Sequence, residues 1–292
     1  MKLHKPINNP FLLFAIVFLA NLLLKLINLG FNSFDYDESI SLKNVGLEFG
    51  HIKHEAEWDN NPPFYYYCLW VWHHFIEINE FNSRLLSVIF NSLAISLFAV
   101  FVSKKVSVFA GVATAIMLSF HTMLLYHAQQ VRCYSLVLLL VVISSIVFFK
   151  FLEKPGIVLA TLLGLVNFLI IYTHYIAGIV LIIQGIVLII HNKRLFWVFS
   201  ISIILEIGLV LLRFTKKQFL NILGFNKKED FWLQTPNFTD LNSTLNTLSN
   251  NTLLKGVFVI AFLALIVLLF VNYSSLMNNS LLLYTGLLAI VP

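Results

Sequence analysis

Long apolar runs separated by polar connections dominate this chain, and they predict membrane-spanning helices. We count nine apolar segments, near residues 10–31, 85–103, 106–126, 134–152, 157–173, 175–191, 195–213, 256–271 and 281–292. A helix needs about 20 mostly apolar residues to cross a bilayer core. The pattern therefore predicts an all-α polytopic membrane protein with about eight or nine transmembrane helices. A shorter aromatic run, Pro63–Ile76, is too short to cross and is expected to be interfacial or re-entrant.

The short connections indicate which way the helices run. Three of them are basic and hold Lys104 and Lys105, Lys150 and Lys154, and Lys193 and Arg194. Short basic loops are typical of the cytoplasmic face. The opposite face then receives residues 32–84 as the first extracytoplasmic loop and 214–255 as a second large one. We find no linker, so we expect one transmembrane module over 1–292.

The last apolar segment is unusually short. Residues 281–292 would make about 18 Å of helix, whereas the hydrocarbon core is about 30 Å thick. Open carbonyl groups are not tolerated in lipid. We therefore expect the sequence to be C-terminally incomplete.

Composition agrees with a chain that is largely surrounded by lipid. The 292 residues are 59% hydrophobic and only 11% charged, against about 45–50% apolar and about 25% charged in soluble domains. The net charge of +5 comes without a basic stripe or a nucleic-acid-binding motif, so we expect no nucleic-acid partner. The two cysteines, Cys68 and Cys133, show no metal-ligand spacing.

Polar and ionisable residues collect at one face under this topology. They are Asp35, Asp37, Glu38, Asn60, Asn61, Arg84, His121, His127, Gln129, Gln130, Arg132, Tyr172 and His174. Such groups are costly near lipid and usually mark a pathway or a site. Because they lie at the extracytoplasmic ends of the spans and not at mid-depth, they point to chemistry at the outer interface.

Structural explanations exist for several of these residues. Asp35 is placed to cap a helix, and the arginines could anchor helix ends. The adjacent pair Asp37 and Glu38 is harder to explain in that way. Neighbours on a helix point about 100° apart, so one carboxylate can face a cavity while the other contacts a loop or a metal.

Several motifs occur in an order that resembles a known family. They are Asp37-Glu38, Asn61-Pro62-Pro63 with the tyrosines that follow, Glu80 to Ser87 around Arg84, Tyr126 to Tyr134 around Arg132, Thr173-His174-Tyr175, and Phe231 to Pro236. Together they resemble the GT-C membrane glycosyltransferases of the protein O-mannosyltransferase and aminoarabinose-transferase type. The resemblance covers roughly residues 30–240. Each motif is weak alone, and their order and spacing carry the similarity.

The resemblance implies a fold and an activity. It implies a GT-C type helical bundle with amphipathic juxtamembrane helices in the first outer loop. It also implies an inverting transfer of a sugar from a polyprenyl-phosphate donor at the extracytoplasmic face of the cytoplasmic (inner) membrane. Asp37 corresponds to the proposed catalytic base, and Arg132 would meet the donor phosphate. Two positions depart from the pattern: Asn61 stands where relatives carry His or Lys, and Gln130 stands where they often carry Glu.

The chemistry of such a transfer assigns candidate roles. The acceptor must lose a proton, so Asp37, with Glu38, forms the catalytic set. The departing phosphate must meet positive charge or hydrogen-bond donors, and Arg132, Arg84 and Asn61 form that set. Tyr65, His127, Gln130 and His174 are expected to line the substrate pocket. No Gly-rich nucleotide loop is visible, which agrees with a lipid-linked donor.

Three questions stay open from the sequence. A divalent cation held by Asp37, Glu38 and a histidine is an alternative without a fixed ligand spacing. The acceptor could be a glycan, a lipid or a protein. A polytopic transporter or lipid flippase is the competing function, because Lys25 and Glu206 lie within apolar segments; a different outer-face glycan polymerase or ligase is the third.

Overall fold

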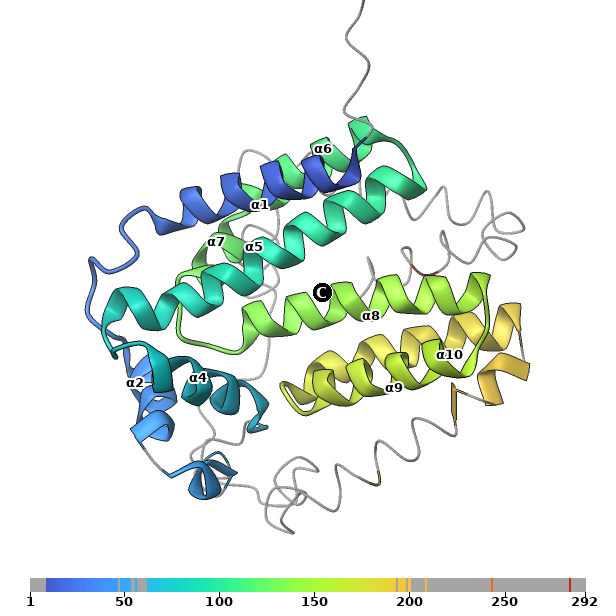
Figure 1. Cartoon of the computed structure of the whole chain (residues 1–292). Helices are drawn as coiled ribbons and strands as arrows, with labels where there is room; N and C mark the ends of the chain where they lie inside the picture. The colour runs from blue at the N-terminus through green and yellow to red at the C-terminus, as the bar shows by residue number, and fades with distance from the viewer. Residues whose placement is uncertain are drawn as a thin grey trace, which may run out of the picture. The chain divides into compact units, whose positions relative to one another are not determined.

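The computed structural model describes residues 9–46, 48–53, 56, 62–192, 194–197 and 199–200, and the single positions 208, 243 and 284. Every regular element in these residues is a helix (Figure 1), which confirms the all-α prediction for this part of the chain. Asn61, Glu206, the predicted loop 214–255 apart from position 243, and most of the last three predicted spans lie outside the described residues.

The chain divides into two compact units. The first comprises Met1–Phe148 and Leu165–Ala177, and the second comprises Phe149–Gly164 and Gly178–Pro292. All described residues of the predicted site fall in the first unit. The expectation of one transmembrane module over the whole chain stays a prediction.

The first unit contains most of the described helices. They are α1 (Pro10–Leu26), α2 (Tyr36–Lys43), α4 (Phe64–Phe75), α5 (Glu80–Lys105), α6 (Val108–Ser119) and α7 (Thr122–Ala128), with the 3₁₀ turns η1 (Asn44–Gly46) and η2 (Phe49–His51). Two further helices, α8 (Tyr134–Glu153) and α9 (Ile157–Ile171), continue from one unit into the other. The turn η3 (Tyr175–Gly178) and helix α10 (Ile179–His191) follow.

Short polar side chains define where three of these helices begin. The Oδ1 atom of Asn9 accepts from the backbone N–H groups of Phe11 and Leu12 at the start of α1. Asn79 caps α5 and Ser107 caps α6 in the same way. Each cap satisfies an N–H group that has no partner within the helix, so the apolar runs start at defined residues.

Helix α5 is the central helix of the first unit, and it packs against α1 and α6. Leu13 and Val17 of α1 form one core with Ile95 and Ala99 of α5 and Ala115 of α6. The backbones of α5 and α6 approach closely at Gly111, where a Cβ atom would lie 2.6 Å from the carbonyl oxygen of Ala99. Only glycine fits this contact.

Two described helices, α5 and α8, are long and apolar enough to cross a membrane. The predicted span 106–126 is not one straight helix, because α6 and α7 meet at an angle of 64° near Phe120 and His121; counted together they make a third candidate. The described helices thus support a helical membrane protein with two or three candidate spans. The larger number of spans stays a prediction.

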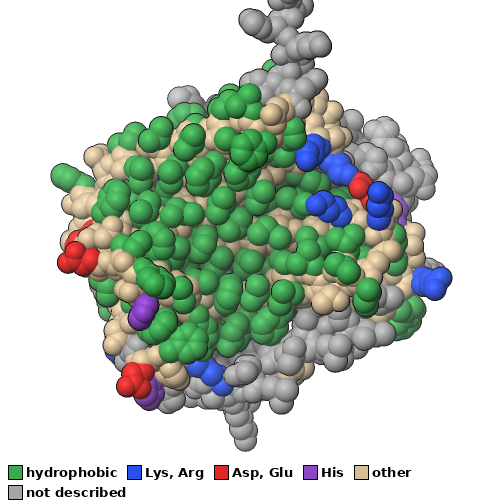
Figure 2. All heavy atoms as spheres, in the orientation of Figure 1, with side chains coloured by type: hydrophobic (Ala, Val, Ile, Leu, Met, Phe, Trp, Pro, Cys, Tyr) green, Lys and Arg blue, Asp and Glu red, His purple; other side chains and the backbone are tan. Residues whose placement is uncertain are grey.

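The surface agrees with contact with lipid. Within the first unit, Figure 2 shows mainly hydrophobic side chains over α1 and α5. Phe11, Leu19 and Leu23 of α1 and Phe109 and Met117 of α6 are among the large apolar side chains that are exposed. Exposed apolar side chains that gather on one helix surface are typical of a face that meets an apolar partner such as lipid. Short helices do occur in the predicted first outer loop, as α2 and α4 show.

Candidate functional site

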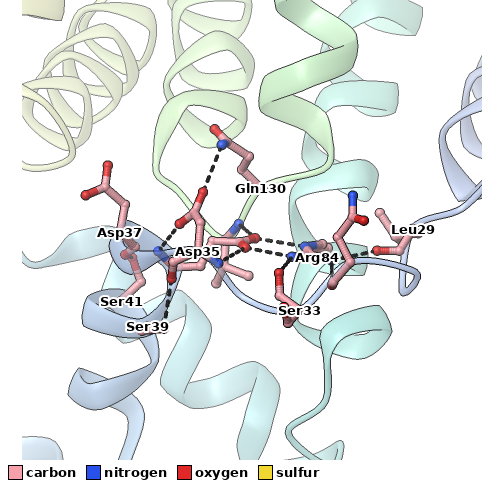
Figure 3. A network of polar contacts seen from close by, with 11 residues as sticks. Leu29, Ser33, Asp35, Asp37, Ser39, Ser41, Arg84 and Gln130 are labelled. Atoms are coloured by element: carbon pink, nitrogen blue, oxygen red, sulfur yellow. Dashed lines mark hydrogen bonds and ion pairs between the residues drawn. The ribbon is translucent and has the colours of Figure 1, made fainter.

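A buried ion pair organises the end of the first unit where α1 ends and α5 begins (Figure 3). Arg84 in the first turns of α5 donates from Nε to Oε1 of Glu38 at 2.8 Å and from Nη2 to Oε2 at 2.7 Å. Only 1% of Glu38 is exposed. This two-pronged geometry is the strong form of an arginine–carboxylate pair.

The remaining N–H groups of Arg84 hold the connection between α1 and α2. Nη1 donates to the carbonyl oxygens of Leu29 and Asn32, and Nη2 donates to that of Ser33. A guanidinium carries five N–H donors, and all five are therefore given to protein acceptors. Arg84 has no N–H donor left for a phosphate, which contradicts its predicted role in phosphate binding.

Glu38 is equally committed to the protein. Its Oε2 accepts from the backbone N–H of Asp35 and its Oε1 accepts from that of Val131. The N–H of Glu38 in turn donates to Oδ1 of Asp35 at 2.7 Å, so Asp35 and Glu38 form a reciprocal capping box at the start of α2. This confirms Asp35 as a helix cap. It also gives Glu38 a structural role in place of the catalytic one that we predicted.

The pKa of Glu38 reflects these contacts. Burial alone would raise it, but the hydrogen bonds from Arg84 and from the N–H groups of Asp35 and Val131 outweigh burial and lower it below the ordinary 4.5. Glu38 is therefore ionised at neutral pH. Its charge is balanced by Arg84.

Asp37 lies one residue before Glu38 but faces a different partner. Its Oδ2 atom is 3.5 Å from Nη2 of Arg132, and the Asp37 side chain is 58% exposed whereas that of Arg132 is 13% exposed. In Figure 3 Asp37 projects to one side of the network, while Asp35 points to Gln130. Asp37 from α2 and Arg132 from the turn before α8 are thus brought together, as predicted from the sequence.

Aromatic rings surround the arginine of this pair. The guanidinium of Arg132 lies over the ring of Tyr134 at 5.9 Å. The Tyr134 ring lies 4.4 Å from the ring of His127 and 5.9 Å from that of His174. Burial, and then the positive charge of Arg132, lower the pKa of His174. His174 is therefore a neutral imidazole near the guanidinium at neutral pH.

The other predicted pocket residues divide into two groups. Gln130 bridges the site, since its Nε2 donates to Oδ2 of Asp35 and its Oε1 lies 3.3 Å from Nδ1 of His127. Tyr65 is only 1% exposed and belongs to the hydrophobic core between α4, α5, α8 and α9. The prediction that Tyr65 lines the substrate pocket is wrong, because an interior ring packed on all sides cannot meet a ligand.

No group of three or more His, Cys, Asp or Glu residues that could hold a metal ion occurs within the described residues. The predicted pair, Asp37 and Glu38, diverges here, because Glu38 turns toward Arg84. These two carboxylates do not form the start of a cation site.

A polar cavity of about 240 Å³, which was not predicted from the sequence, lies beside the ion pair. Its wall includes Asn28, Asn32, Asp35, Tyr126, Gln129 and Gln130. Asn28 and Asn32 come from the turn after α1, where a left-handed φ of 57° at Asn28 marks an unusual backbone. The sequence signal for this cavity is the turn from Asn28 to Ser33, which carries two amide side chains directly after an apolar run.

Comparison with protein-family models, with curated proteins and with solved structures finds no match to this chain. Function is therefore inferred from the motifs and from the geometry of the site.

Proposed function

We propose that this chain is an integral-membrane inverting glycosyltransferase of the GT-C type. It moves a sugar from a polyprenyl-phosphate donor to a glycan, lipid or protein acceptor at the extracytoplasmic face of the cell membrane. The proposal rests chiefly on the approach of Asp37 to Arg132 at 3.5 Å, which joins a carboxylate and a guanidinium 95 positions apart in the sequence.

The two partners differ in a way that suits this reaction. Asp37 is largely exposed, so an acceptor hydroxyl or amine can reach it. Arg132 is mostly buried, which strengthens its interaction with an anion. In contrast to Arg84, its contacts among the described residues include the ion pair with Asp37 and the ring of Tyr134. Guanidinium N–H groups match phosphate oxygens in geometry.

The reaction then follows in one displacement. The acceptor oxygen or nitrogen forms a bond to the anomeric carbon as its proton passes to Asp37. The bond from that carbon to the phosphate oxygen breaks, and polyprenyl phosphate leaves with the electron pair. Arg132 stabilises the charge that develops on the phosphate, as donors aimed at developing charge do. Attack from the face opposite the leaving group inverts the anomeric centre.

Asp37→Asn provides the direct test, with Glu77→Gln as a matched control. Glu77 is an exposed acid just before α5 that has no described contact to the site. A positioned base contributes roughly 10²–10⁴-fold, so we expect transfer from polyprenyl-phosphate sugars to fall by about that factor in Asp37→Asn only. Transfer near the wild-type rate in a folded Asp37→Asn protein would contradict the assignment.

A transporter or flippase is the competing proposal, and one described residue favours it. Lys25 of α1 is fully buried, and its Nζ donates to Oδ1 of Asn21 at 2.6 Å. Buried ionisable groups in spans often belong to transport pathways. Purified protein in proteoliposomes separates the two functions, since a transferase forms a new glycosidic product and a flippase only moves the lipid-linked sugar between leaflets.

A further inference from the structure

The polar cavity beside the Arg84–Glu38 pair is separate from the Asp37–Arg132 pair, because neither Asp37 nor Arg132 lines it. It lies entirely within the first unit, between the turn after α1 and the residues around the end of α7. At about 30 Å³ of liquid volume per water, its volume of about 240 Å³ equals about eight waters. That is room for one pyranose ring.

The hydrogen-bonding groups at this cavity are largely available. The side-chain amides of Asn28 and Asn32 and the hydroxyl of Tyr126 have no partner among the described residues. Gln129 donates from Nε2 to the carbonyl oxygens of Lys25 and Ile27, which orients the amide and leaves its oxygen to accept. Amides both donate and accept, as a ligand rich in hydroxyl groups requires.

Charge argues against an anion in this cavity. Asp35 and Glu38 are acidic, and Arg84 has donated every N–H group to the protein. A phosphate or carboxylate would therefore meet net negative charge and find no free guanidinium donor. A neutral ligand meets no such penalty, and its hydroxyl groups can donate to the carboxylate of Asp35.

Tyr126 adds an apolar face to these polar groups. It is 59% exposed, and its ring lies edge-on to the ring of His127 at 5.2 Å between centroids. An aromatic ring with a polar tip offers a flat surface for the C–H face of a sugar and a hydroxyl for its rim.

We propose that this cavity binds a neutral glycosyl unit through Asn28, Asn32, Gln129 and Tyr126. The site would hold the uncharged sugar portion of a substrate, while phosphate is bound elsewhere. A role for this sugar in the transfer reaction rests on the proposed function. The binding itself does not.

The backbone at Asn28 allows a variant that separates binding from folding. Asn28 adopts a left-handed φ of 57°, which glycine adopts without a steric cost. Asn28→Gly therefore removes the amide and keeps the turn. Asn32→Ala removes a second amide and leaves the Asn32 carbonyl oxygen that Arg84 uses. Tyr126→Ala removes the ring, and Glu77→Gln again serves as the control.

Full-length protein in lipid nanodiscs is titrated with methyl hexopyranosides and methyl pentopyranosides by saturation-transfer NMR. Cyclohexanol, inorganic phosphate and glucosamine are the comparison probes. We expect saturable binding of at least one neutral glycoside, without competition from phosphate. One hydrogen bond contributes about 0.5–1.5 kcal/mol, so Asn28→Gly and Asn32→Ala should each raise Kd about two- to tenfold, with a larger rise in Tyr126→Ala.

Several results would overturn this proposal. They are no saturable glycoside binding at the highest soluble concentration, binding that the three variants leave unchanged, displacement by phosphate, preference for glucosamine, or equal binding of cyclohexanol. Failure here is distinguishable from failure of the proposed function. If Asp37→Asn loses transfer but the cavity binds no glycoside, only the proposed sugar site is refuted. Glycoside binding with full transfer in Asp37→Asn would refute the catalytic assignment alone.

Discussion

Arg84 and Glu38 are joined by two hydrogen bonds of 2.8 and 2.7 Å across 46 positions of sequence. Their contacts tie the start of α5 to the turn after α1, to the start of α2 and to Val131. The pair thus joins the segments that carry Asp37 and Arg132. Asp37 on α2 and Arg132 next to Val131 are therefore positioned by a contact in which neither takes part.

Loss of either member of this pair should destabilise the fold more than it changes the chemistry. Removing one partner of a buried pair leaves a buried charge without compensation, which costs roughly 3–5 kcal/mol. We expect a clear fall in Tm for Arg84→Gln and for Glu38→Gln in detergent-solubilised protein. Lys104→Gln, at an exposed lysine near the end of α5, is the control and should leave Tm unchanged. Equal Tm values in all three variants would contradict the structural role.

The same pair predicts how stability depends on pH. The pKa of Glu38 is lowered in the folded protein from the ordinary value of 4.5. A lowered folded-state pKa means that this stabilisation is fully present above pH 4.5 and is lost as the pH falls through the lower value. We expect the Tm of the wild-type protein to fall as the pH drops below 4.5. Over the same pH series, the Tm of Glu38→Gln should fall less steeply. Equal slopes of Tm against pH in the two proteins would contradict this role of Glu38.

Arg132 should behave differently from Arg84. Its carboxylate partner among the described residues is the exposed Asp37, so its loss should reduce transfer and leave most of the stability. Removal of one donor aimed at developing charge costs about 10²–10³ in rate, and we expect such a fall in Arg132→Ala. Arg132→Lys should recover only part of it, because an ammonium lacks the planar fork. Paired kcat and Tm measurements check this; a large loss of Tm with normal kcat per folded molecule would contradict it.

The sequence predicted the parts of the site that depend on local patterning. The long apolar runs predicted the helices α5 and α8. The polar residues at the ends of such runs predicted the helix cap at Asp35 and the approach of Asp37 to Arg132. The roles of Glu38 and Arg84 did not follow. A buried pair and an exposed site look alike in sequence, since both place charge at the end of a span, and only the packing around them decides.

Two other features depended on tertiary contacts in the same way. Tyr65 lies in an aromatic run that reads as interfacial, yet the packing of α4 against α5, α8 and α9 buries its ring. The run 106–126 is mostly apolar, yet it bends by 64° between α6 and α7. No proline or glycine marks that bend, so the hydropathy pattern could not reveal it.

The buried Lys25 of α1 depends on one hydrogen-bond acceptor, and this dependence can be tested by mutation. Lys25 donates to Asn21, and Asn21 donates to Oγ of Ser119 on α6 at 2.9 Å. Asn21→Leu removes the acceptor and should lower Tm, because Lys25 is then buried alone. Replacing buried polar partners together by apolar residues is often neutral or stabilising, so Asn21→Leu with Lys25→Met should be at least as stable as the single variant. A double variant that is less stable than Asn21→Leu would contradict this.

The contact of α5 with α6 at Gly111 is tight enough to be tested by one methyl group. A Cβ atom there would lie 2.6 Å from the Ala99 carbonyl oxygen and 2.7 Å from Cβ of Ser103. Because the nearest atom is backbone, the helices must move apart, and overpacking of this kind costs about 1–3 kcal/mol. Gly111→Ala should therefore lower Tm. Gly50→Ala, where nothing lies within 4 Å of the added atom, should not, and equal Tm values for the two would show that α5 and α6 do not pack this closely.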